Sequence, residues 1–167
     1  MNRNRIAVSL VVLLAALAAH AQSATQQSFD SIKALAGSWE GKTQMSHPVQ
    51  VSFRLTAGGS AVMSEIVSHM NGKSEDMITM FNMDGDRLLL THYCAAGNQP
   101  RMKASASADG KTLTFDFLDA TNLSGPDAPH MHRVVFSFID GNHHTEEWHF
   151  AVGGKEMVET FDLQKKS

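Results

Sequence analysis

The residues of this sequence best able to do chemistry are its histidines, some of which occur two positions apart on strand-like segments. His130 and His132 flank one residue, and His92 stands two positions before the single cysteine, Cys94. An imidazole can form hydrogen bonds, transfer a proton near neutral pH or bind a metal ion. A spacing of two puts both side chains on the same face of a strand. The face they occupy therefore decides what they can do.

We expect several polar residues to point inward, because they alternate in phase with apolar residues of their own strands. In a small barrel, the apolar face of each strand turns to the interior. His92, for example, follows Leu88 and Leu90 at a spacing of two. The inward set predicted in this way is Glu65, His92, Cys94, His130, His132, His144, Glu146, Trp148 and Glu159. The strand of Glu65 is ambiguous, since Ile66 supports the opposite face, and a β-bulge in any strand would reverse its assignment.

These residues predict a ligand site inside the barrel. His92 and His132 would bond the polar end of a ligand, and Glu65 would hold an imidazole in one tautomer. Arg101 ends a polar stretch that could contact a ligand at the barrel mouth. The predicted ligand-binding residues are Glu65, His92, Arg101, His130, His132 and Trp148. For each of them, a role as a paired core or rim residue is the alternative, because an unpaired buried polar group costs about 1–3 kcal/mol.

Catalytic and metal chemistry have less support from motifs. The sequence has no Gly-x-Ser-x-Gly elbow, phosphate-binding loop, calcium loop or paired-cysteine motif. We therefore predict neither catalytic residues nor a resident metal or cofactor. The alternatives left open are a haem-binding barrel, a small enzyme that uses inward His and Glu side chains as acid and base, and a structural barrel with a filled core. A metal site on His130 and His132 also stays open, with His92 or Glu65 as its third ligand. Enzymatic activity stays undecided, with a binding protein favoured.

The first 21 residues are typical of a secretory signal peptide. Arg3 and Arg5 precede an apolar run from Ile6 to Ala19, and small residues follow at the positions that a signal peptidase reads. The prediction is a signal peptide over 1–21, a single domain over 22–167 and a periplasmic or secreted protein. The apolar run is shorter than the roughly 20 residues that a span needs, so we expect no membrane span in the mature protein.

The net charge and the composition of the chain limit the chemical class of partner that we expect. Removal of the signal would take two of the 14 basic residues and none of the 17 acidic ones, which leaves 12 − 17 = −5. This charge argues against nucleic acid as a partner, and a small apolar molecule is expected instead. Cys94 is either buried or a reactive thiol, and burial is favoured. Ten Met and nine Phe suggest a soft apolar interior. No pattern indicates an oligomeric state.

Alternation of apolar and polar residues dominates the chain from Trp39 onward. The clearest case is the run Val49, Val51, Phe53 and Leu55, and glycine-containing turns separate it from the runs that follow. About ten strands joined by hairpins predict an all-β fold, an antiparallel up-and-down β-barrel, with an open two-sheet sandwich as the alternative. A short N-terminal helix is expected from Ser28 to Leu35, after an irregular stretch over 22–27.

The layout resembles the calycin group of small barrels, which includes lipocalins, fatty-acid-binding proteins and nitrobindin-like haem barrels. A short helix is followed by Gly37-x-Trp39-x-Gly41 at the start of the first strand and by a hairpin meander to the end of the chain. Thr43 stands where the nitrobindin pattern has its last Gly. The last Arg, Arg133, comes too early for the Arg that packs across this Trp in lipocalins. The resemblance implies a barrel with an internal cavity and leaves the ligand open.

Overall fold

The computed structural model describes residues 23–70, 73–125 and 127–167, which form one helix, a short 3-10 turn (η1, Ala57–Gly59) and ten strands. The predicted signal peptide lies outside the described residues. The helix is α2 (Ala24–Ala34). The strands are β1 (Gly37–Thr43), β2 (Pro48–Thr56), β3 (Ala61–Met70), β4 (Lys73–Asp84), β5 (Arg87–Tyr93), β6 (Gln99–Ala106), β7 (Thr112–Thr121), β8 (His130–Asp140), β9 (His143–Val152) and β10 (Lys155–Lys165).

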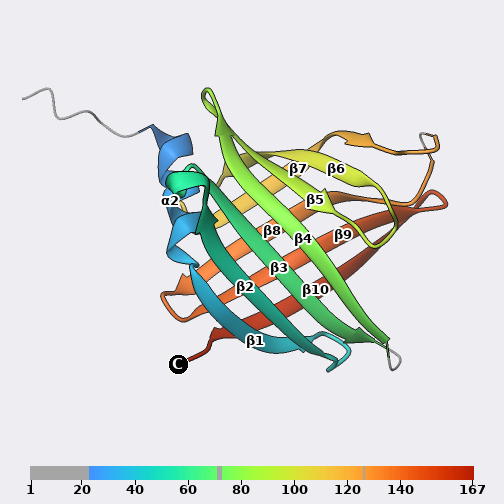
Figure 1. Ribbon diagram of the computed structural model, residues 1–167, viewed down its shortest axis with the longest axis horizontal. Helices are drawn as coiled ribbons and strands as arrows, with labels where there is room; N and C mark the ends of the chain where they lie inside the picture. The colour runs from blue at the N-terminus through green and yellow to red at the C-terminus, as the bar shows by residue number, and fades with distance from the viewer. Residues whose placement is uncertain (1–22, 71–72, 126) are drawn as a thin grey trace, which may run out of the picture.

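The strands close into a barrel in which each pairs antiparallel with its neighbours in sequence, and β1 pairs with β10 (Figure 1). The predicted up-and-down barrel of about ten strands is thereby confirmed, and the open sandwich is wrong. Closure through the β1–β10 pairing leaves neither strand as an unpaired edge. Because consecutive strands alternate in direction, the β1–β2, β5–β6 and β9–β10 connections meet at one end of the barrel. The β2–β3, β4–β5, β6–β7 and β8–β9 connections lie at the end where α2 packs.

Helix α2 covers that second end (Figure 1). Its buried face carries Phe29 and Ile32, which belong to the main core. The helix begins earlier than the sequence prediction, because Ser23 rather than Ser28 is the N-cap. The Ser23 side chain accepts a hydrogen bond from the backbone N–H of Gln26 at 3.1 Å. Residues 24–27, which were predicted to be irregular, form the first turn of the helix.

The Gly–Trp–Gly stretch after the helix has the structural role that its residue types predict. Trp39 is buried, and its indole N–H donates to the Leu35 carbonyl at 2.7 Å, which ties the first strand to the helix end. Gly41 is needed for close approach, since a Cβ atom there would lie 1.8 Å from the carbonyl oxygen of Asp162 on β10. The observed spacing of β1 and β10 at this point therefore requires glycine, because any Cβ atom would force the two backbones apart.

The helix end of the barrel is filled by aromatic side chains. Phe81 packs edge-on against Phe115 and Phe136, with ring centroids 5.6 and 5.8 Å apart, and Phe53 packs against Phe81 and Phe136 at 6.5 Å. All four rings are buried. Dense ring packing at this end fills the interior of the barrel beneath the helix.

Candidate ligand-binding cavity

The end of the barrel opposite α2 contains a cavity of about 670 Å³. Its walls come from the β1–β2 and β5–β6 connections and from the mouth-side ends of β3, β4, β8, β9 and β10. The lining residues are mostly apolar, and they are Gln44, Met45, Ile66, Ser68, Glu75, Met77, Cys94, Ala95, Ala96, Met131, Trp148, Phe150, Met157, Val158, Glu159 and Phe161. Cavities of roughly 300–1,000 Å³ with apolar walls and a few polar groups are typical of small-molecule sites.

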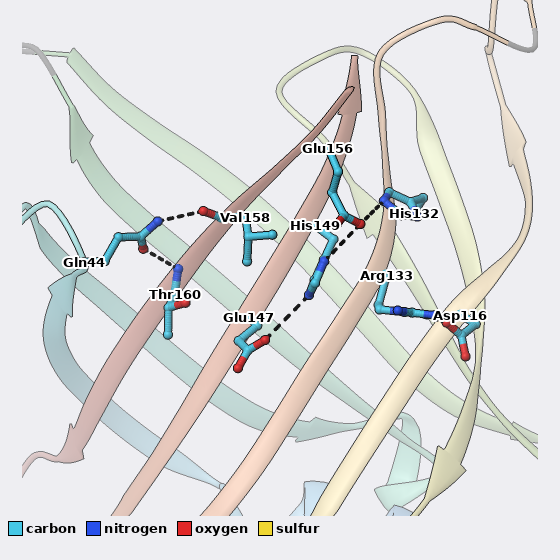
Figure 2. Close-up of polar contacts among 9 residues, drawn as sticks. All are labelled: Gln44, Asp116, His132, Arg133, Glu147, His149, Glu156, Val158 and Thr160. Carbon is cyan, nitrogen blue, oxygen red and sulfur yellow. Dashed lines mark hydrogen bonds and ion pairs between the residues drawn. The ribbon is translucent and has the colours of Figure 1, made fainter. Parts of the chain in front are cut away.

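One polar lining residue, Gln44, forms hydrogen bonds that hold the barrel together. Its side-chain amide donates to the carbonyl of Val158 at 2.6 Å and its side-chain oxygen accepts from the backbone N–H of Thr160, as Figure 2 shows. These bonds extend the pairing of β1 with β10 beyond the last residue of β1. Gln44 therefore shapes the rim, and its bond to Val158 uses one of the two N–H donors of its side-chain amide.

Two other lining residues have polar atoms without a protein partner. The hydroxyl of Ser68 and one carboxylate oxygen of Glu159 are buried, and neither makes a hydrogen bond within the described structure. Burial raises the pKa of Glu159, and the nearby Glu75 adds to this effect, while His47 opposes it. Unpaired buried polar atoms carry a free-energy penalty that a ligand bearing a hydrogen-bond donor would relieve.

Cys94 also lines the cavity, so its side chain faces inward as the alternation predicted. Its sulfur lies 3.5 Å from the backbone nitrogen of Ala96, and the residue is partly buried. Burial raises the pKa of the thiol, which favours the protonated form at neutral pH. A thiol of this kind contributes apolar, polarisable surface to the wall.

Below the cavity, His92 and Trp148 form a packed pair. Trp148 lines the cavity, and the His92 ring lies against it with centroids 4.8 Å apart. His92 has no exposed surface; its Nδ1 lies 2.9 Å from the Thr79 hydroxyl, and its Nε2 has no partner in the described structure. Burial lowers the pKa of His92 to about 4, so the imidazole is neutral at physiological pH.

Trp148 is also held from behind by a buried carboxylate. Its indole N–H donates to one oxygen of Glu146 at 2.9 Å, and the other oxygen of Glu146 lies 3.1 Å from Nε2 of His144. The side chains of Glu146 and His144 have no exposed surface. The His144 ring in turn meets the Trp39 ring edge-on at 4.3 Å. Glu146 and His144 thus connect the Trp148 indole at the cavity floor with the Trp39 indole at the closed end of the barrel.

Of the six predicted ligand-binding residues, Trp148 lines the cavity, and His92 has the predicted inward direction without reaching the cavity. His92 lies beneath the lining instead, against the ring of Trp148. The inward prediction is also right for Cys94, Glu146 and Glu159.

Glu65 and Arg101 lie on the outer wall, so the predictions that placed them at the cavity are wrong. Ile66 is buried and lines the cavity, and its neighbour Glu65 is therefore exposed on the opposite face. Arg101 lies on β6 rather than in a loop, and its guanidinium makes hydrogen bonds of 2.6 and 2.5 Å to the carboxylate of Asp119. The side chain follows the outside of the barrel between β6 and β7.

His130 and His132 do not face the cavity either, because β8 has an irregular register between Met131 and Arg133. This shift makes Met131, the residue between the two histidines, the one that lines the cavity. His130 packs against Phe117 instead, with ring centroids 4.8 Å apart. The inward prediction for both histidines fails for the physical reason that a bulge reverses the alternation of a strand.

His132 belongs instead to a polar cluster on the outer face, which Figure 2 shows. One oxygen of Glu156 lies 2.8 Å from Nε2 of His132 and 3.1 Å from Nδ1 of His149. Nε2 of His149 lies 3.6 Å from Glu147. The close approach of His149 to Glu156, followed by that of His132, lowers the pKa of Glu156. This cluster joins β8, β9 and β10 across the wall.

Sequence reasoning missed Glu75, Ser68 and the methionines as cavity residues. Glu75 alternates in phase with Met77 and Phe81, so the rule that identified Glu159 would also have identified Glu75. Ser68 alternates with Ile66 and gave no signal of its own, since a serine occurs as readily on an exposed face.

Two absences hold for the described residues only. In the ranges 23–70, 73–125 and 127–167, no group of three or more His, Cys, Asp or Glu side chains is arranged to hold a metal ion. The helix in this same part of the chain is not long and apolar enough to cross a membrane.

Fold and cavity together define a closed ten-stranded antiparallel barrel with an apolar internal space. No protein-family model matches the sequence, and no curated protein does. Among solved structures, 18 chains match. One is a protein of unknown function from the DUF3598 family of Nostoc punctiforme PCC 73102, with a TM-score of 0.53 and 11% sequence identity. The match covers 81% of this chain and 49% of that one, so this chain spans about half the length of its neighbour. At this identity the likeness shows the fold alone.

Proposed function

We propose that this protein binds a small, largely apolar molecule in the cavity at the open end of the barrel. The observation that carries the proposal is the cavity of about 670 Å³ with walls dominated by methionine, aromatic and small side chains. Burial of apolar ligand surface against such walls would supply the affinity, at about 25 cal/mol per Å² of apolar area removed from water. Methionines such as Met77 and Met131 adapt to ligands of different shape.

The proposal includes membership of the calycin-like barrels and export from the cytoplasm. The closed end of the barrel supports the calycin-like membership. Lys165, near the C-terminal end of the last strand, has its ammonium nitrogen 5.3 Å from the centroid of the Trp39 ring. A cation over this indole is the arrangement that lipocalins achieve with arginine. Support for export is the signal-peptide pattern of residues 1–21.

The haem and enzyme alternatives rest on other residues than the notable histidines. None of the described lining residues is a histidine, so a haem in this cavity would need Cys94 or a methionine as its axial ligand. His92 has no exposed surface and lies beneath the lining, so acid–base chemistry in the cavity would fall to Glu75 and Glu159. The apolar cavity itself is direct support for the binding function, which is why we propose it first.

Binding can be measured with a neutral apolar fluorophore, N-phenyl-1-naphthylamine, whose emission rises in apolar surroundings. Ser68→Phe places a ring inside the cavity, whereas Val67→Phe places the same ring on the outer face of β3, one residue away. We expect saturable binding to the unchanged protein and to Val67→Phe, and loss of binding to Ser68→Phe.

Thermal unfolding of both variants shows whether each is folded. Equal binding to a folded Ser68→Phe variant, or no saturable binding to the unchanged protein, would contradict the proposal. Native mass spectrometry of protein purified from its own host would then identify a retained ligand by its mass.

A further inference from the structure

The charges that line the cavity are all of one sign among the residues described. Glu75 and Glu159 contribute two carboxylates, and none of the other described lining side chains is Lys, Arg or His. The two glutamates come from β4 and β10, so they face the cavity from different walls. Burial and the neighbouring Glu75 raise the pKa of Glu159, and a cationic ligand would oppose that shift by stabilising the ionised carboxylate.

The unpaired polar atoms of the lining point to the same kind of ligand. Ser68 is 3% exposed, its hydroxyl has no partner in the described structure, and it faces the cavity from β3. One buried oxygen of Glu159 is likewise unpaired. A hydroxyl oxygen and a carboxylate oxygen both accept hydrogen bonds, and a primary ammonium group offers three donors and a positive charge.

None of the described polar lining groups carries a positive charge that could pair with an anionic ligand. One N–H of the Gln44 amide is bonded to the backbone of β10, the Ser68 hydroxyl can donate as well as accept, and the Cys94 thiol is a weak donor, so the discrimination between charged heads rests on the two glutamates. A carboxylate head group would therefore enter beside two other carboxylates without a cation to pair with. Like charges at such a site cost affinity.

We propose that the cavity selects amphiphiles with a cationic, hydrogen-bond-donating head, such as a primary ammonium, over their neutral and anionic counterparts. This selectivity rests on the proposed binding function. The alkyl part lies against the methionines and the floor formed by Ile66, Trp148 and Phe161, and the ammonium lies between Glu75, Glu159 and the hydroxyl of Ser68.

Three probes of equal chain length separate this proposal from the general function: decylammonium, 1-decanol and decanoate. Each is titrated against bound N-phenyl-1-naphthylamine near neutral pH and at low salt. We expect decylammonium to bind about tenfold or more tightly than decanoate, with 1-decanol between them, since one favourable charge contact in a partly buried site is enough for that ratio.

Two sets of variants assign the preference to the cavity. Glu75→Gln combined with Glu159→Gln removes both charges with little change in shape, and should bring the affinities for decylammonium and decanoate to within a few-fold of one another. Glu147→Gln is the matched control, because it removes one carboxylate from the outer face of β9 and should leave the ratio unchanged.

The outcomes are distinct. If 1-decanol binds but decanoate binds as tightly as decylammonium, the charge selectivity is wrong and the binding function stands. If no probe displaces the fluorophore, the binding function fails. A preference for decylammonium that survives in the folded double variant, or that Glu147→Gln abolishes, would overturn the assignment to Glu75 and Glu159. The ratio in the unchanged protein decides the main point even if the double variant does not fold.

Discussion

His92 should make the stability of this protein fall as the solution is acidified from neutral pH. Burial lowers its pKa from 6.5 in an exposed chain to about 4 in the fold. At pH values between these two pKa values, His92 is protonated in the unfolded state but not in the folded state. The free energy of unfolding therefore decreases as the pH decreases through this range. The His92 contribution is intact above about pH 6.5 and is lost progressively down to about pH 4.

The size of the effect follows from the two pKa values. The full difference corresponds to about 3 kcal/mol, and proton linkage gives a loss of about 2 kcal/mol between about pH 7 and about pH 5. Because His92 has no exposed surface, solvent screening does not reduce this figure. Other groups also titrate in this range, so the measurement must isolate the histidine by difference.

The assay is urea-induced unfolding at both pH values for the unchanged protein and for His92→Leu. The variant loses the bond to Thr79 at every pH, but its free energy of unfolding should fall by about 2 kcal/mol less on acidification. Thr79→Val is the control: it removes the hydroxyl but keeps the imidazole buried, so the full pH dependence should persist. The reasoning is refuted if His92→Leu and the unchanged protein lose equal stability between the two pH values.

Three further predictions concern the closed end, the cavity floor and the outer wall. Gly41→Ala should lower stability by about 1–3 kcal/mol through its clash with the backbone of β10, whereas Gly141→Ala, with open space around its Cβ position, should change the melting temperature little. Trp148→Phe should cost about 1–3 kcal/mol in denaturant unfolding, because a buried carboxylate oxygen loses its donor; a cost near zero would show that the bond contributes nothing. His149→Ala should raise the pKa of Glu156 toward its ordinary value in a carboxyl NMR titration, and an unchanged pKa would contradict the bond drawn in Figure 2.

The closed barrel could be predicted from the sequence because strand alternation and hairpin turns repeat along almost the whole chain. The same alternation put His92, Cys94 and Glu159 correctly inside, since their strands are regular near these positions. It failed at His130 and His132, where a single bulge moves Met131 to the cavity side. A bulge has no fixed residue signature, so alternation alone does not reveal it.

The first residue of the helix was also predicted wrongly, although the sequence contains a signal for the correct position. Ser23 and Gln26 stand three positions apart, as in a capping box, and the structure uses Ser23 as the N-cap. The cavity itself could not be predicted in detail, because it depends on which inward residues are too small or too flexible to fill the space. Ser68 and Met77 show this, since neither residue type distinguishes a packed interior from a hollow one.

The hollow end of the barrel raises the question of what holds its strands in place where no core fills the space. Side-chain contacts on the outer face join neighbouring strands in this half of the barrel. They are the Arg101–Asp119 pair between β6 and β7, the Arg133–Asp116 pair between β7 and β8, the cluster of His132, His149 and Glu156 across β8, β9 and β10, and the bonds of Gln44 from the end of β1 to β10.

Each of these exposed contacts contributes little stability alone, about 0–1 kcal/mol for a surface ion pair. Their positions matter more than their energies, because they follow one another across successive strands from β6 through β10 to β1; Figure 2 shows those from β7 onward. The aromatic core performs this task at the helix end, where Phe81, Phe115 and Phe136 touch one another. The barrel can thus remain open at one end because its walls are tied from outside, which leaves the interior available to a ligand.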